Sequence, residues 1–304
     1  MNKGFYNKSI TINNAQLSAM VSLFSSSVMQ ELSTKGISAT LARLVREIPE
    51  PFVQKSTVYD LYEGVFTFLK KEEYRHEYTY QSAIIQKILL GKHNLKTATL
   101  LSEFRVQNNK VDIAILNGTS TAYEIKSERD NLSKIFQQTN SYRNFFARTY
   151  VVTCEKHATE LKKTINKDIG IYILNNRFQL TLDREAINDP SRISPLVVLD
   201  SLPRRESIKV LETLKLEIPN VPNTLIYKEL KSIFSALDPE EVHKAMLSVL
   251  KESRSQKEAS TLIDTISKNH PISAALLTKK INSESRKNII DAMNTPLNNI
   301  SRWQ

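Results

Sequence analysis

The distribution of proline is the feature that most constrains the fold of this chain. Pro49 and Pro51 stand together, the next proline is Pro190, and residues 52–189 contain none. Proline breaks helices and is almost excluded from central strands, so a long stretch without it can hold both without interruption. We therefore expect the main domain inside this stretch, with a loop-rich connection at the prolines that follow it.

The spacing of apolar residues separates helices from strands. A period near 3.6 predicts helices over 16–32, 38–48, 57–71 and 77–90, the last with Gly91 as its C-cap. A period of two predicts strands over 99–106, 111–116 and 121–127. Asn117 and Gly118 favour a tight hairpin between the last two strands, because such turns need a positive φ.

After the hairpin the predicted elements alternate, with helices over 131–146 and 155–166 and strands over 148–154, 169–174 and 178–182. This rhythm is typical of an α/β layer with parallel crossovers. Further helices are predicted over 207–216, 223–237, 239–252, 258–268, 273–281 and 285–293. We thus expect three parts: an N-terminal helical region (1–71), an α/β core (72–189) and a C-terminal helical region (190–304).

The composition excludes several classes of protein. Lys and Arg total 42 against 32 Asp and Glu, a net charge of +10 that is spread along the chain and suits a polyanionic partner. The single cysteine, Cys154, excludes an intramolecular disulfide framework. We find no apolar run near the ~18 residues of a membrane span, no secretory signal pattern and no Gly-rich phosphate loop. We expect a soluble, cytoplasmic protein with no membrane partner.

Charged residues on the predicted hairpin form the pattern that points to chemistry. Asp112 lies before the Asn-Gly turn, and Glu124 and Lys126 lie after it on one face, because strand residues two apart point the same way. Charges on a half-buried strand are costly unless they are paired or bind a metal. Converging carboxylates favour a hard cation such as Mg²⁺, and an adjacent ammonium can stabilise charge on a phosphate. Metal-dependent phosphodiester hydrolysis is the favoured interpretation, and a solvated cross-strand salt bridge is the alternative.

Asp112 followed by Glu124-Ile125-Lys126 resembles the motif of the PD-(D/E)XK nuclease superfamily. The core of that superfamily is a helix, a three-strand meander that carries these residues, and a further helix and strand, which is the order predicted above. The resemblance covers roughly residues 74–175 and implies a restriction-endonuclease-like α/β core, a mixed sheet flanked by helices. The chain is also similar to little-characterised bacterial and phage-borne proteins with helical regions on both sides of this core.

The resemblance implies how the site would hold a metal. Asp112, Glu124 and the backbone carbonyl of Ile125 would bind Mg²⁺ or Mn²⁺, and Lys126 would orient or activate the attacking water. Val111 stands where the motif often has proline, a position that holds no metal.

Further residues are assigned by the same resemblance. Gln138 and Tyr142, one helical turn apart, are similar to the Gln-x-x-x-Tyr motif of the RecB-type branch, and would support the site or touch the substrate phosphate. Glu77 would hold a second metal or a metal-bound water, although an acidic residue at a helix start is also favoured by the helix dipole. Basic residues near the hairpin are candidates for nucleic-acid binding: Arg105, Lys110, Arg129 and Lys134.

We therefore expect a Mg²⁺- or Mn²⁺-dependent nuclease, with DNA favoured over RNA, that acts in defence against foreign DNA or in DNA processing. One alternative is a catalytically silent nucleic-acid-binding or regulatory module that recruits a partner. Another is a toxin-like nuclease controlled by an inhibitor. The helical flanks would suit a homodimer or a protein partner.

Overall fold

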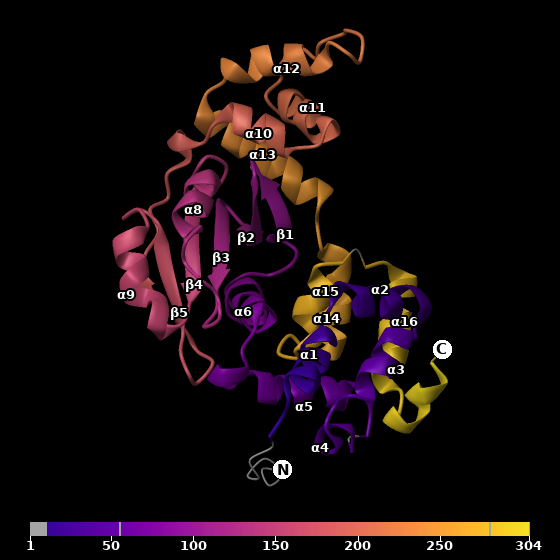
Figure 1. The fold of residues 1–304 in the computed structure, drawn as a ribbon. Helices are drawn as coiled ribbons and strands as arrows, with labels where there is room; N and C mark the ends of the chain where they lie inside the picture. The colour runs from indigo at the N-terminus through magenta and orange to yellow at the C-terminus, as the bar shows by residue number, and fades with distance from the viewer. Residues whose placement is uncertain (1–10, 55, 280, 304) are drawn as a thin grey trace. The chain divides into compact units, whose positions relative to one another are not determined.

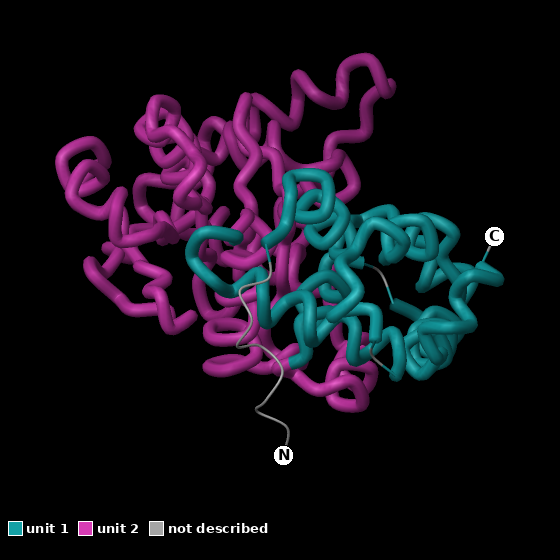
Figure 2. Tube along the Cα trace, turned by 60° about the horizontal axis from the view of Figure 1, so that its bottom comes forward, with its two compact units in different colours: residues 1–74, 270–304 teal, residues 75–269 magenta. Residues whose placement is uncertain are grey.

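The computed structural model describes residues 11–54, 56–279 and 281–303. Contacts divide the chain into two compact units, one of residues 1–74 with 270–304 and the other of residues 75–269 (Figure 2). This grouping differs from the three consecutive parts expected from the sequence. The last segment of the chain returns to the N-terminal helices, and residues 190–269 fold with the sheet.

The first unit is helical, and α16 packs against α2 and α5 within it. Ser38 and Thr57 stand at the predicted starts of their helices and cap α3 and α5, because their side chains accept hydrogen bonds from backbone N–H groups of the first turn. The single helix expected over 16–32 is wrong, because Ser25 caps a new helix inside it. The elements are α1 (Asn14–Ser22), α2 (Ser26–Lys35), α3 (Ala39–Val45), α4 (Glu50–Val53), α5 (Val58–Leu69), η1 (Glu72–Tyr74), α15 (Ile272–Leu277), α16 (Ser283–Asn294) and η5 (Leu297–Arg302).

The second unit begins with a helical segment made of α6 (Glu77–Ile84), the π-helical turn η2 (Ile85–Leu89) and α7 (Leu90–Lys92). The expected C-cap at Gly91 is wrong, since Gly91 lies inside α7. A Cβ atom at Gly91 would stand 3.0 Å from the carbonyl oxygen of Gln86. Glycine therefore permits a close backbone approach at the π turn, and it does not end the helix.

Within the described residues, six strands form one mixed sheet in the order β1-β2-β3-β4-β5-β6 (Figure 1). β3, β4 and β5 are parallel, and the other neighbours are antiparallel. Gly118 has φ 70°, as the predicted hairpin requires. The strands are β1 (Thr99–Val106), β2 (Asn109–Leu116), β3 (Ser120–Lys126), β4 (Arg148–Thr153), β5 (Gly170–Leu174) and β6 (Leu180–Arg184). The mixed α/β architecture expected from the sequence is confirmed.

Two crossover helices, α8 (Ile135–Arg143) and α9 (Glu155–Thr164), connect the parallel strands. They pack on the face of the sheet that carries Val151 and Ile171, with which Ile135 and Leu161 share a buried apolar cluster. Glu124 pairs in register with Val151, so its side chain points to the face that α8 covers.

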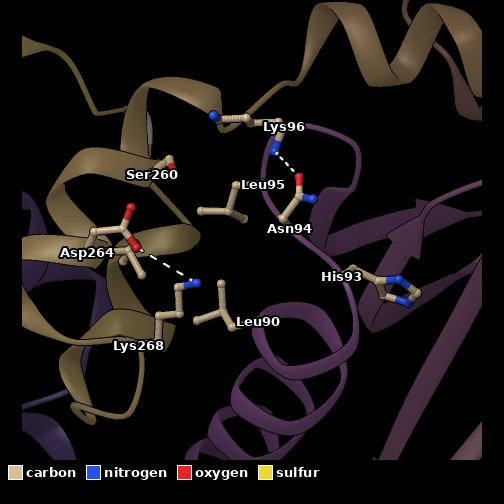
Figure 3. Close-up of a pocket in the computed structure, with 9 residues that line it drawn as sticks. Leu90, His93, Asn94, Leu95, Lys96, Ser260, Asp264 and Lys268 are labelled. Carbon is tan, nitrogen blue, oxygen red and sulfur yellow. Dashed lines mark hydrogen bonds and ion pairs between the residues drawn. The ribbon is translucent and has the colours of Figure 1, made fainter.

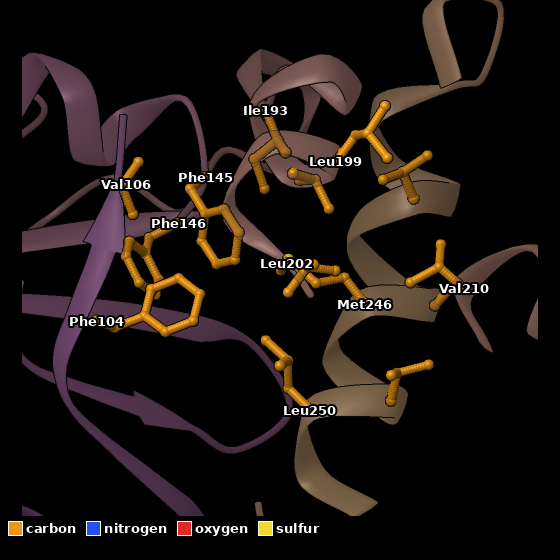
Figure 4. Packing of buried hydrophobic residues seen from close by; sticks show 14 of the residues in the cluster. Phe104, Val106, Phe145, Phe146, Ile193, Leu199, Leu202, Val210, Met246 and Leu250 are labelled. Carbon is orange, nitrogen blue, oxygen red and sulfur yellow. The ribbon is translucent and has the colours of Figure 1, made fainter. Parts of the chain in front are cut away.

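Helices after the sheet pack with β1, β2 and the end of α8 in a second hydrophobic cluster. Phe104 on β1 and Phe145 after α8 pack in one cluster with Leu199, Val210 and Met246 (Figure 4). α10 was not expected from the sequence, and it begins where Ser194 caps a helix that has Pro195 in its first turn. The elements are η3 (Pro190–Arg192), α10 (Pro195–Ser201), α11 (Arg204–Thr213), α12 (Ile226–Ser235), α13 (Pro239–Ser253), η4 (Lys257–Ala259) and α14 (Ser260–Ile266). In the part of the chain that the structure describes, no helix is long and apolar enough to cross a membrane.

Candidate active site

Strand register aligns three carboxylates across the sheet. The β1–β2 register pairs Ser102 with Ile113 and Phe104 with Val111, so Glu103 and Asp112 stand at facing positions between these pairs. The β2–β3 register, continued one step beyond Ile113 and Tyr123, brings Asp112 level with Glu124. Opposite residues of antiparallel strands share a face of the sheet. The hairpin therefore brings Asp112 and Glu124 together, as the sequence predicted.

Asp112 takes the place of a backbone acceptor between the two strands. The β2–β3 ladder ends at Ile113 and Tyr123, and beyond it Asp112 Oδ2 accepts a hydrogen bond of 2.6 Å from the backbone N–H of Ile125. The N–H and C=O of one strand residue point toward the same neighbouring strand. The Ile125 carbonyl therefore also faces β2, the side on which it was predicted to bind a metal.

Glu124 is only 1% exposed, and both of its carboxyl oxygens have partners. Lys126 Nζ donates to Oε1 at 2.7 Å, and the Tyr142 hydroxyl lies 2.8 Å from Oε2. A polar interaction with the nearby Gln138 also lowers the pKa of Glu124, as the smallest of several causes. Gln138 and Tyr142 are one turn apart on α8, and that spacing lets both side chains reach the same carboxylate.

A second carboxylate group meets Asp112 from the other side. Oxygens of Glu77, Glu103 and Asp112 all lie within 4.8 Å of one another. Glu77 is exposed at the start of α6, and its Oε1 accepts a hydrogen bond from Gln81. The sequence analysis predicted Glu77 at the site and missed Glu103. The sequence signal for Glu103 was the two-residue turn between Val106 and Asn109, because counting residue by residue away from that turn along both strands brings Glu103 level with Asp112.

The electrostatics of the group disfavour so many negative charges without a cation. Burial, followed by the nearby Glu124, raises the pKa of Asp112 well above its usual range. Burial also raises the pKa of Glu124, although Lys126 and the hydrogen bonds of α8 oppose this. Desolvation and the adjacent Glu103 raise the pKa of Glu77. Each shift means that the ionised carboxylate is destabilised where it stands.

The donor set fits a hard divalent cation. All of the converging groups are oxygens, which Mg²⁺ and Mn²⁺ prefer. A buried amide oxygen, Oε1 of Gln138, has no hydrogen-bond partner among the described residues. An acceptor of this kind can bind a water molecule of a hydrated ion. The residues present therefore fit a hydrated divalent cation.

The four basic residues predicted to contact nucleic acid are all exposed. Lys110 belongs to the carboxylate group, since its Nζ lies 2.6 Å from Glu103 Oε2. Arg105 lies on β1, and Lys134 immediately precedes α8. Arg129 follows β3 and lowers the pKa of His76 together with burial, which is the larger cause. No described contact links Arg105 or Lys134 to the carboxylates, whereas Lys110 contacts Glu103 directly.

A pocket of about 230 Å³ lies elsewhere, between the segment around His93 and α14 (Figure 3). His93, Asn94, Lys96, Asp264 and Lys268 supply its polar lining. It includes none of the predicted site residues, so the candidate active site is defined by the strand carboxylates and not by this pocket.

Comparisons with known proteins identify the family. The profile of the family described as bacteriophage P4 protein cII matches residues 70–279. Protein cII of Enterobacteria phage P4 is 33% identical over 85 residues, which are 27% of this chain and 32% of that protein. The chain thus spans about a third of the length of the curated relative it matches. A solved protein of unknown function from Silicibacter pomeroyi has a TM-score of 0.26 at 17% identity, over 34% of this chain and 67% of that one, which is too low to support a structural argument. The match over residues 70–279 shows that the chain belongs to the bacteriophage P4 protein cII family.

Proposed function

We propose that the chain is a divalent-cation-dependent nuclease of the PD-(D/E)XK type that hydrolyses phosphodiester bonds in DNA. The observation that carries the proposal is the geometry where β2 and β3 separate beyond Ile113 and Tyr123, a place we call the β2–β3 fork. Asp112 accepts a hydrogen bond from the Ile125 N–H, Lys126 lies 2.7 Å from Glu124, and the charge of Glu124 helps to raise the pKa of Asp112. Glu124 therefore connects Lys126 electrostatically to Asp112, which also meets Glu77 and Glu103.

The surrounding fold supports this proposal. A helix precedes a three-strand meander, and a helix and a parallel strand follow it, in the order of the nuclease core. The contacts of Gln138 and Tyr142 with Glu124 suit the Gln-x-x-x-Tyr motif of the RecB-type branch. A solvated salt bridge explains less, because Glu124 is almost fully buried and buried ion pairs add little stability by themselves.

The roles of the residues follow from their positions. Bound Mg²⁺ would supply Lewis-acid stabilisation of the phosphate and a more acidic water. Asp112, Glu124 and the Ile125 carbonyl would hold the ion, with Glu77 beside them. Lys126 would orient the attacking water and stabilise developing negative charge, since its ammonium already lies against Glu124.

On α8, Tyr142 fixes the position of Glu124. Its hydroxyl lies 2.8 Å from the Glu124 carboxylate and donates to the Lys110 carbonyl at 2.7 Å. This contact joins α8 to both strands of the hairpin and keeps the carboxylate in place.

The test is a cleavage assay with the wild type and with Asp112→Asn and Lys126→Ala. Each protein is incubated with linear, circular and single-stranded DNA in Mg²⁺, Mn²⁺ or EDTA, and with RNA in parallel. Cleavage by the wild type in Mg²⁺ or Mn²⁺, and its loss in both variants and in EDTA, is the expected result. Intact substrates with the wild type, or equal cleavage by the variants, would exclude this site and favour a binding module.

Biological context is part of the proposal. A nuclease of this family would act in the cytoplasm, in defence against foreign DNA or in DNA processing. Toxicity on expression that disappears with Lys126→Ala would indicate an enzyme that needs an inhibitor. Harmless expression of an active enzyme would indicate that none is required.

A further inference from the structure

Lys110 and Lys126 occupy matching places on the two strands of the fork. Lys110 lies two residues before Asp112 on β2, and Lys126 lies two residues after Glu124 on β3, so each points to the same face as its carboxylate. Each ammonium also contacts a carboxylate of the group. Lys126 contacts Glu124 at 2.7 Å, and Lys110 contacts Glu103 at 2.6 Å.

The Glu103–Lys110 pair is poorly explained as a stabilising salt bridge. Both side chains are 53% exposed, and exposed pairs contribute little to stability. Glu103 also has φ 52°, a left-handed conformation that is unfavourable for a residue with a Cβ atom. Its carboxyl group lies within 4.8 Å of those of Glu77 and Asp112, where like charges repel.

The backbone of Lys110 is tied to the site independently of this pair. Its carbonyl accepts a hydrogen bond of 2.7 Å from the Tyr142 hydroxyl, the group that also contacts Glu124. The start of the Lys110 side chain is therefore fixed relative to the buried carboxylate, while about half of the side chain remains exposed.

We propose that Glu103 positions Lys110 as a second phosphate-binding lysine of the site, with the Glu103 carboxylate bridging the predicted cation site and the Lys110 ammonium. This inference rests on the proposed nuclease function and assigns Glu103 and Lys110 distinct parts in it. Glu103 acts on the cation and on Lys110. Lys110 contacts a phosphate of the bound strand, where a positive charge beside the cation binds a phosphate oxygen.

The two roles predict opposite effects on metal binding and on DNA binding. Calorimetry with Mn²⁺ alone should show roughly tenfold weaker binding for Glu103→Gln, because a negative ligand is lost. Lys110→Met should bind Mn²⁺ at least as tightly as the wild type, since one nearby positive charge is removed.

Steady-state cleavage of DNA should show the reverse pattern. Lys110→Met should raise KM roughly tenfold with kcat within about twofold. The slope of log KM against log salt concentration should also decrease by about 1, as expected for the loss of one phosphate contact. Lys110→Arg should restore most of the KM effect, because it keeps the charge. Lys162→Met is the matched control, since the half-exposed side chain of Lys162 pairs with Asp183 on the far strand β6.

The outcomes separate this inference from the proposed function. A wild type that neither binds Mn²⁺ nor cleaves DNA overturns both. If the wild type cleaves DNA and Lys110→Met has the KM and salt dependence of Lys162→Met, only the role of Lys110 is overturned. If Glu103→Gln binds Mn²⁺ as the wild type does, the bridging role of Glu103 is overturned.

Discussion

Replacement of Asp112 by asparagine is expected to abolish cleavage and to stabilise the protein in EDTA. The amide oxygen of the new side chain would still accept the hydrogen bond from the Ile125 N–H, so the β2–β3 fork should remain intact. The variant would lose a negative charge that lies within 4.8 Å of oxygens of Glu77 and Glu103, and that interacts with Glu124. A residue chosen for folding alone would therefore not be aspartate.

The size of the effect can be estimated from these distances. Two unit charges at this separation repel by about 3 kcal/mol at an effective dielectric constant of 20. Lys110 and Lys126 offset much of this, which leaves a net gain of about 1–2 kcal/mol for Asp112→Asn. For a unit of this size that gain raises Tm by roughly 2–8 °C.

Mn²⁺ should reverse the order of stability. A ligand at 100 times its Kd stabilises the folded state by about 2.7 kcal/mol, or roughly 5–10 °C here. The wild type should show this increase, whereas Asp112→Asn should show little of it.

The assay is thermal unfolding at neutral pH in EDTA and in excess Mn²⁺, followed by circular dichroism. Asp264→Asn is the control, because Asp264 is 60% exposed in a loose pair with Lys268 and its loss should change Tm by less than about 2 °C. An Asp112→Asn variant that melts below the wild type in EDTA, or that gains as much from Mn²⁺, would refute the reasoning.

Three further predictions concern the fold around the site. Tyr142→Phe should lower stability by about 1–3 kcal/mol and reduce cleavage, because Glu124 loses a buried partner; unchanged urea unfolding and rates would contradict this. Gly170→Ala should destabilise more than Gly118→Ala in the same unfolding assay, since a Cβ at residue 170 would lie 2.2 Å from the Tyr150 ring. A Cβ at residue 118 would meet open space, so the only cost there is the strain of a φ of 70°; equal effects would contradict this. Burial lowers the pKa of His243 to about 4, so the unfolded state takes up a proton first as the pH falls below 6.5. His243 should therefore contribute a loss of about 2 kcal/mol between pH 7 and pH 5, and His243→Gln should lose about that much less than the wild type; equal pH dependence in both proteins would contradict it.

Local sequence signals predicted much of the sheet and its hairpin. Asn117 and Gly118, with period-two segments on either side, were enough to place Asp112 near Glu124. Helix starts were equally informative, and Asp238, directly before the helix predicted over 239–252, caps α13 by accepting two backbone hydrogen bonds. These features depend on residues a few positions apart, so a single sequence contains them.

Other features depend on contacts between distant segments. Glu103 joins the carboxylate group through the β1–β2 register, which depends on the length of the turn between these strands, and it adopts an unusual φ that its residue type does not predict. Phe104 packs with Met246 in one core, so the helices after the sheet belong to the same unit, although their sequence suggested a separate region. Metal binding and cleavage remain predictions.

A crystal structure of the wild type soaked with Mn²⁺, with anomalous scattering data, tests the central claim most directly. The account predicts an anomalous peak bounded by carboxyl oxygens of Asp112 and Glu124 and by the Ile125 carbonyl, and none there in Asp112→Asn. Bound Mn²⁺ only at other positions, or no bound ion while Lys126 and Glu124 keep their 2.7 Å contact, would contradict it.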